Sequence, residues 1–158
     1  MRRAVGSDTR FLELRRLLDS LQQDYRLSSS ELVALAQGIR VPPTVLALGL
    51  SPLEAVATYL VEERQLSITT VARLLCRSKQ GIWQAVSDAR RKLQKRVWPG
   101  ASPHDLPVET LGKKPRSLLE NLVTYLHEQR KLSFADIARL IDRNQRTVWT
   151  AYHRAREK

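Results

Sequence analysis

Two stretches of the sequence, residues 51–92 and 117–158, match each other in register without a gap. Tyr59 corresponds to Tyr125, so the offset is 66 residues (125 − 59). Upstream, Val41-Pro42 and Leu106-Pro107 also correspond, at an offset of 65 (106 − 41). Residues aligned in this way are counterparts of each other. A repeat of this length indicates two copies of one supersecondary unit, and we expect each copy to begin with a short extended segment.

The apolar residues of each copy recur at steps of three and four, which is the period of an amphipathic helix. Ser67 or Ser133 is expected to cap a second, short helix, and Ser78 or Asn144 a third. The expected core residues of the first helix are Leu53, Val56, Ala57, Leu60 and Val61, or Leu119, Leu122, Val123 and Leu126. Those of the third helix are Ile82, Val86 and Ala89, or Val148, Tyr152 and Ala155.

A short helix, a turn and a longer helix, packed on a preceding helix, form the helix-turn-helix arrangement. Ala72 and Ala138 lie near the middle of the short helices, where a small side chain allows a close crossing. The sequence therefore predicts an all-α fold with two tandem three-helix units. The expected boundaries are an N-terminal helical segment at 1–40, units at 41–98 and 106–158, and a linker at 99–105. The alternative is a plain helical hairpin repeat without a ligand.

The segment before the repeats has a different character. Phe11, Leu14 and Leu18 belong to an amphipathic pattern, and Ser28 with Glu31 forms a capping-box signature. Residues 1–50 carry seven basic and five acidic side chains, or a net charge of only +2 (7 − 5). Packing or homo-oligomerisation through this helix is expected rather than DNA contact.

The strongly basic charge of the chain limits the classes of partner that it can bind. The net charge is +11 and the isoelectric point is near 10.5, which favours a polyanionic partner. The chain has a single cysteine and three scattered histidines, and it lacks a phosphate-cradling glycine loop, so no enzyme activity, metal or cofactor is expected. No apolar stretch is long enough to span a membrane, and the first residues do not form a secretory signal, so a cytoplasmic location is expected.

A family likeness is carried by residues 132–158, LSFADIARLIDRNQRTVWTAYHRAREK, and less closely by residues 66–92. This pattern resembles the fourth region of bacterial sigma factors, the helix-turn-helix that reads promoter DNA. The resemblance implies a sequence-specific DNA-binding protein of the nucleoid, a transcription regulator or sigma-like factor with double-stranded DNA and RNA polymerase as partners. No segment resembles the family's second region. Cys76 and Asp142 replace the family's usual turn glycine, which predicts an alternative turn.

The third helix of each unit supplies the candidate DNA contacts. Residues near its start are expected to read base edges in the major groove, namely Lys79, Gln80, Gln84, Gln145, Arg146 and Thr150. Further basic and hydroxyl side chains are expected to contact phosphate, namely Arg77, Arg90, Arg91, Lys92, Lys95, Arg96, Arg143, Thr147 and Arg154. The alternative for this second set is a solvated helix face.

Two details predict that the units differ. Gly81 weakens the first recognition helix by about 1 kcal/mol relative to alanine, whereas its counterpart Thr147 can bind phosphate, so the second unit is expected to be the main reader. Trp83 and Trp149 are expected to pack against the first helix of each unit, the alternative being contact with thymine methyl groups or a protein. An adaptor that binds RNA polymerase or another protein is the competing function, and RNA binding is disfavoured.

Overall fold

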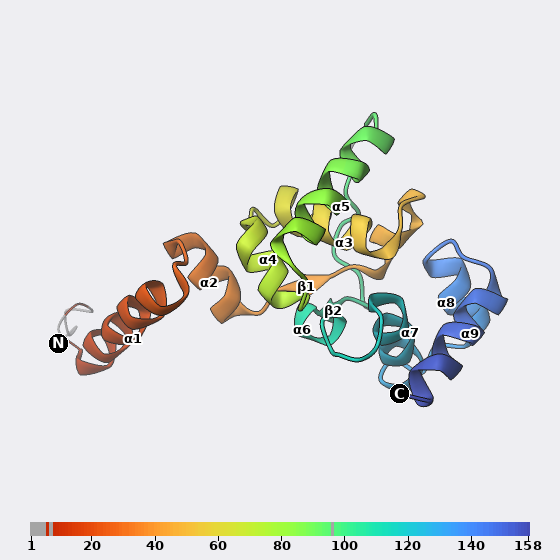
Figure 1. Cartoon of the computed structure of the whole chain (residues 1–158). Helices are drawn as coiled ribbons and strands as arrows, with labels where there is room; N and C mark the ends of the chain where they lie inside the picture. Colours follow the sequence, from red (N-terminus) through yellow and green to blue (C-terminus); the bar gives the residue numbers. More distant parts are fainter. Residues whose placement is uncertain (1–5, 7, 96) are drawn as a thin grey trace. The chain divides into compact units, whose positions relative to one another are not determined.

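The computed structural model describes residues 6, 8–95 and 97–158, and within these it shows an all-α fold, as the sequence predicts (Figure 1). The chain divides into two compact units, Met1–Gly38 and Ile39–Lys158. The elements in chain order are α1 (Thr9–Tyr25), α2 (Ser29–Gln37), β1 (Arg40–Val41), the 3-10 helix η2 (Pro43–Leu48), α3 (Pro52–Glu62), α4 (Ile68–Leu74), α5 (Lys79–Lys92), β2 (Leu106–Pro107), α6 (Val108–Leu111), α7 (Leu118–Glu128), α8 (Phe134–Leu140) and α9 (Gln145–Arg156).

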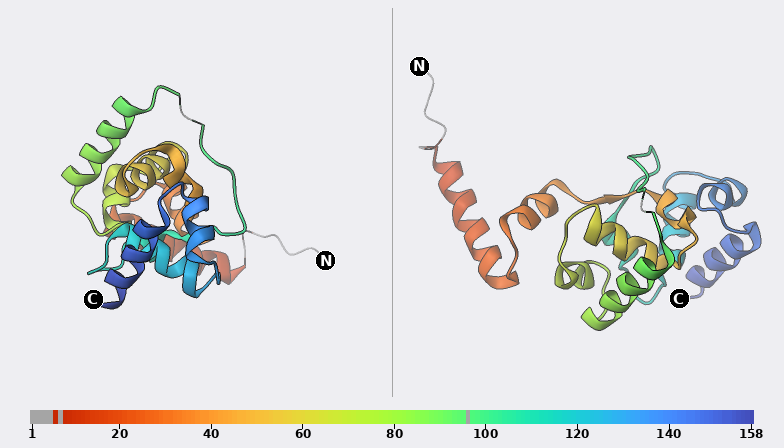
Figure 2. Two further views of the ribbon diagram at one scale, coloured as in Figure 1. Left: turned by 90° about the vertical axis from the view of Figure 1, so that its right-hand side faces the viewer. Right: turned by 90° about the horizontal axis from the view of Figure 1, so that it is seen from above.

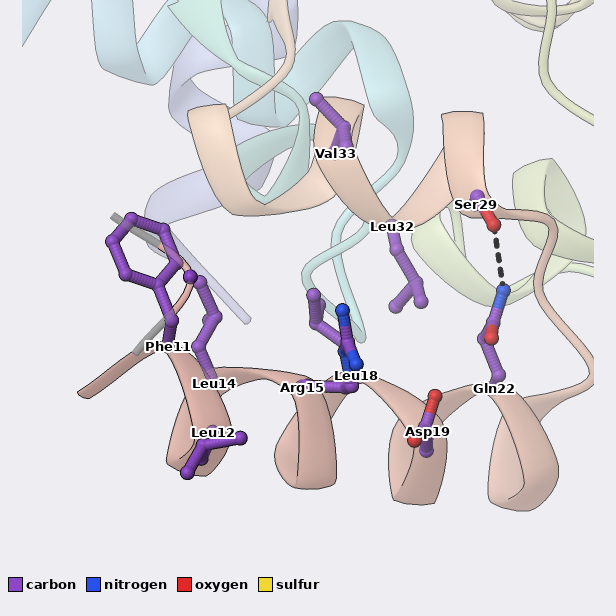
Figure 3. A pocket seen from close by; sticks show the side chains of 11 residues that line it. Phe11, Leu12, Leu14, Arg15, Leu18, Asp19, Gln22, Ser29, Leu32 and Val33 are labelled. Atoms are coloured by element: carbon purple, nitrogen blue, oxygen red, sulfur yellow. Dashed lines mark hydrogen bonds between the residues drawn. The ribbon is translucent and has the colours of Figure 1, made fainter. Parts of the chain in front are cut away.

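The N-terminal unit consists of α1 and α2. The predicted capping box is present, because the Ser28 side chain accepts from the Glu31 amide and the Glu31 carboxylate accepts from the Ser28 amide. No residue of α1 is buried. A mostly apolar groove lies between the two helices, and Leu32 of α2 points across it toward α1 (Figure 3). The amphipathic pattern of the sequence thus forms a helix whose apolar face stays open to solvent.

The two sequence copies each form a three-helix unit, the first repeat (α3, α4 and α5) and the second repeat (α7, α8 and α9). The third helix packs on both preceding helices in each repeat. Counterpart side chains fill the two cores, and each of the following is at most 1% exposed: Leu60, Leu75 and Ile82 in the first repeat, and Leu126, Ile141 and Val148 in the second. Tyr152 is only half-buried, and Ala151 is buried in the core of the second repeat instead.

Every helix of the repeats begins at a side-chain cap. Ser67, Ser78, Ser133 and Asn144 accept hydrogen bonds from backbone amides as the sequence predicts. The first helices carry full capping boxes, Ser51 with Glu54 and Ser117 with Glu120. Each cap of this kind stabilises a helix by about 1 kcal/mol, so the caps fix where the short second helices and the longer third helices start.

The turn between the second and third helix closes in the same way in both repeats. The Arg77 amide donates to the Ala72 carbonyl and the Cys76 amide to that of Arg73, which together form a Schellman motif. Cys76 has a φ of 50°, in the left-handed region that favours glycine. The counterpart Asp142 also has a φ of 50°. The expectation of an alternative turn was therefore wrong: the turn keeps the glycine-type conformation without a glycine.

The two repeats are joined by more than the segment between them. β1 and β2 pair in an antiparallel two-stranded sheet, with Val41 opposite Leu106. These strands are the extended segments expected at the start of each unit. α3 packs against α7, and η2 packs against α8. Both repeats consequently lie within the single compact unit Ile39–Lys158, and the segment 99–105 connects parts that already touch.

Candidate nucleic-acid interface

The start of α5 and the start of α9 each present polar and basic side chains to solvent. Lys79, Gln80 and Gln84 are exposed on α5 because Ile82, Ala85 and Val86 take the opposite face into the core. On α9, Gln145, Arg146 and Thr147 are exposed and Thr150 is half-buried. Each set of expected base-reading residues therefore falls on the exposed side of one helix, in its first two turns.

α5 and α9 lie toward the same side of the Ile39–Lys158 unit. In Figure 2, α5 and α9 lie to the left of α8 in the left view and below α8 in the right view. The colours along the two helices advance in opposite directions in Figures 1 and 2, so the helices run in opposite senses. The two helices therefore lie on a side of the unit that one extended partner could span.

A groove beside α9 gathers several of the expected contacts of the second repeat. Arg146, Thr147, Thr150 and Arg154 line one wall, and residues from the start of α7 line the other. The Asn144 side chain at the edge of the groove caps α9 by accepting a hydrogen bond of 2.8 Å from the Arg146 amide. The Arg146 side chain itself has no ion pair or hydrogen bond within the described part of the chain, which leaves its five donors available to a partner.

Several expected phosphate contacts already have partners inside the protein. The Lys92 ammonium lies 2.8 Å from the Glu54 carboxylate, and its counterpart Lys158 lies 2.9 Å from Glu120. Burial raises the pKa of Glu54, but hydrogen bonds from Lys92 and the Ser51 amide outweigh it and hold the pKa below its usual value of 4.5. The same balance holds for Glu120. In each repeat, the lysine thus links the C-terminal end of the third helix to the capping-box glutamate of the first helix.

The arginines of the same set are also engaged. Arg90 pairs with Glu62 at 2.9 Å, and Arg91 pairs with Asp88. The Arg143 guanidinium donates to the Leu50 carbonyl at 2.6 Å, across the junction between the repeats. Arg77 is half-buried and donates to the carbonyl of Cys76. The geometry therefore assigns these side chains a structural role first.

The described members of the expected phosphate set that remain are exposed to solvent. Lys95, Thr147 and Arg154 are exposed, and Arg96 lies outside the described residues. Gln84, from the base-reading set, donates to Asp88 at 3.0 Å. The exposed side chains that keep their polar groups available are thus more numerous on α9 than on α5.

Trp83 and Trp149 are not packed against the first helices, and that expectation was wrong. Trp83 is 54% exposed and Trp149 49% exposed. They are counterparts (149 − 83 = 66), so both repeats place an indole among the exposed polar residues of the third helix. The Trp149 ring lies 4.0 Å from that of His153, centroid to centroid. Trp83 and Trp149 lie at about 100° from the centre of the core face of their helices, a position that is compatible with both a buried and an exposed indole.

Sequence reasoning missed an aromatic cluster that supports α9. His127 of α7 stacks on Phe134 of α8 at 4.4 Å between centroids, and Tyr152 of α9 contacts both rings. The Tyr152 hydroxyl donates to Glu128 at 3.1 Å. The first repeat has the aliphatic residues Val61 and Ile68 where the second has His127 and Phe134. This difference between counterparts was the sequence signal that could have predicted the cluster. The cluster holds α9 against its two neighbours, α7 and α8.

Two other features, a metal-binding cluster and a membrane-spanning helix, are absent from the described residues. There, no group of three or more histidine, cysteine or acidic side chains is placed to hold a metal ion. None of the helices in the described ranges combines the length and apolar character needed to cross a membrane. Comparison of the chain with protein-family models, curated proteins and solved structures gives no match.

Proposed function

We propose that the protein binds double-stranded DNA by placing α5 and α9 in the major groove. The observation that carries this proposal is that α5 and α9, which both carry exposed polar and basic side chains in their first two turns, lie toward the same side of the Ile39–Lys158 unit. An α-helix fits the major groove of B-form DNA, where each base pair has a distinct pattern of donors and acceptors. Under this proposal each repeat is a helix-turn-helix unit.

The charge distribution supports a polyanionic partner. Residues 1–50 contribute +2, so residues 51–158 carry the remaining +9 (11 − 2). Arg146 is suited to bidentate contact with guanine, and Gln80 is suited to adenine. Thr147 and Arg154 line the groove beside α9 and are proposed to contact phosphate. Positioning and base reading would then come from one helix face.

The second repeat is proposed as the main reader. The Arg146 side chain is uncommitted within the described structure, whereas Gln84 of the first repeat is bound to Asp88. The second repeat also carries the fuller likeness to the fourth region of sigma factors. We therefore propose a transcription regulator or sigma-like factor, with RNA polymerase as a further partner.

The test is a titration of labelled duplex DNA at several salt concentrations. Release of condensed counterions makes the logarithm of the binding constant fall linearly with the logarithm of the salt concentration. We expect a slope of about −4 or steeper, since each phosphate neutralised contributes about −0.9. A weak, salt-independent interaction would overturn the proposal.

A protein-binding adaptor is the second candidate, and the exposure of Trp83 and Trp149 favours it. Tryptophan is enriched at protein interfaces, while in a DNA complex the same indoles would meet thymine methyl groups. The double variant Trp83→Ala/Trp149→Ala separates the two functions. A DNA reader keeps most of its salt-dependent affinity in this variant, because phosphate contacts remain. An adaptor loses capture of RNA polymerase and shows little DNA binding before or after the change.

A further inference from the structure

The pairing of β1 with β2 has the register of a two-fold axis. In an antiparallel pair, such an axis places the central residue of one strand opposite its own counterpart and pairs the flanking residues crosswise. Val41 is opposite Leu106, and these two residues are counterparts at the offset of 65. Both side chains are fully buried. The repeats therefore meet around a shared point rather than following each other by translation.

The contacts around this sheet are reciprocal, as an axis of this kind requires. η2, which leads into the first repeat, packs against α8 of the second. In return, Gly112 at the end of α6, which leads into the second repeat, lies against the backbone of Leu74 and Leu75, where α4 of the first repeat ends. The two first helices, α3 and α7, pack against each other. These three contacts, together with the strand pair, thus relate the repeats by approximate two-fold symmetry.

The orientation of the third helices agrees with this symmetry. α5 and α9 run in opposite senses and lie toward the same side of the unit (Figure 2). Two-fold related recognition helices approach successive turns of the major groove in opposite directions, and the DNA half-sites they read are inverted. Tandem units on a flexible linker would instead tolerate either orientation and several spacings.

We infer that one copy of this chain reads an inverted, imperfect repeat in DNA, with α5 on one half-site and α9 on the other. This inference rests on the proposed DNA-binding function. The halves are unequal because Lys79, Gln80 and Gln84 read one of them, while Gln145, Arg146 and Thr150 read the other. The spacing is fixed, since the strand pair and the reciprocal contacts hold the repeats in one compact unit.

The first experiment selects bound sequences from a pool of random duplexes with the full chain. The expected result is one motif with two similar, inverted halves at a single spacing. A direct repeat, a lone half-site or a range of spacings overturns the inference while leaving DNA binding intact. Failure to enrich any sequence overturns the inference and sequence-specific binding together, and the salt titration then shows whether DNA is bound at all.

The second experiment assigns each half-site to a helix. Arg146→Ala and Lys79→Ala are compared on the selected duplex and on duplexes with one half scrambled, with Arg16→Ala in α1 as the matched control. On the intact site Arg146→Ala is expected to lose about tenfold affinity and Lys79→Ala less. Each variant is expected to lose little more when its own half is already scrambled. If Arg146→Ala impairs both halves equally, two chains each use α9, and the inference is wrong.

Discussion

Val41 lies directly opposite Leu106 in the small sheet at the junction of the two repeats, and the two residues are counterparts in the sequence. Neither side chain is accessible to solvent. The packing of the repeats therefore depends on their lead segments as much as on the helices. This relationship makes the junction a part of the core that substitutions can test.

Gly112 is the sharpest place to test the junction. Its φ of −86° suits any residue, but an added Cβ would overlap the Leu74 carbonyl oxygen and lie 3.2 Å from the Leu75 backbone. We expect Gly112→Ala to lower the free energy of unfolding by about 2 kcal/mol, measured by urea denaturation. Gly100→Ala is the control, because nothing lies within 4 Å of its added Cβ. Equal stability of the two variants would show that the end of α6 is not closely packed against the end of α4.

The left-handed turn residue predicts a stabilising change. Cys76 adopts a φ of 50°, a conformation that costs a non-glycine residue about 1–2 kcal/mol. A glycine at this position would avoid that cost, but it would lose more backbone entropy on folding, which offsets part of the gain. Cys76→Gly should therefore raise the free energy of unfolding by about 0.5–1 kcal/mol. Cys76→Val, which is β-branched, should lower it. Calorimetric melting of the two variants beside the parent checks the order, and a more stable valine variant would contradict the assigned turn.

The paired capping-box glutamates predict how stability depends on pH. The pKa values of Glu54 and Glu120 lie below 4.5 in the folded chain, so each contributes stability that is full above about pH 4.5 and is lost as the pH falls through the folded value. Glu54→Gln should be less stable than the parent at pH 7, and the gap should narrow in acid. Denaturation curves from pH 7 to pH 3 measure this, with the exposed Glu109→Gln as control. A gap that stays constant with pH would exclude the ion pair with Lys92 as its cause.

The proposed recognition helices, α5 and α9, predict an order of binding losses. Arg146→Ala should reduce sequence-specific affinity more than Lys79→Ala, because arginine can bind guanine through two parallel hydrogen bonds and its side chain is uncommitted in the described structure. We expect a loss of about tenfold or more for Arg146→Ala in an anisotropy titration. Equal losses for the two variants would remove the ranking of the repeats.

Much of the fold follows from local rules in the sequence. The caps at Ser67, Ser78, Ser133 and Asn144 and the core positions at Ile82 and Val148 obey helix chemistry that acts within a few residues. The pairing of Val41 with Leu106 is a contact between segments 65 residues apart (106 − 41), and only its two strand segments were predictable.

The candidate site was predicted less completely. Helical projection places Arg146 and Gln80 outward correctly because the core face is clear. It fails for Trp83, which lies at the border of that face, where burial depends on the neighbouring helix. It also treats Lys92 and Arg143 as surface charges, although partners distant in sequence, Glu54 and the Leu50 carbonyl, bind them.

The most direct test of DNA reading by α5 and α9 is site-directed cleavage from each helix. The single cysteine is first replaced as Cys76→Asp, which copies the residue at its counterpart Asp142. Ser87→Cys on α5 or His153→Cys on α9, which are counterparts, is then labelled with a chelated iron that generates hydroxyl radicals. We predict that each label cuts the selected duplex within a different half-site. Uniform cleavage along the duplex, or the same cuts from both labels, would contradict the account.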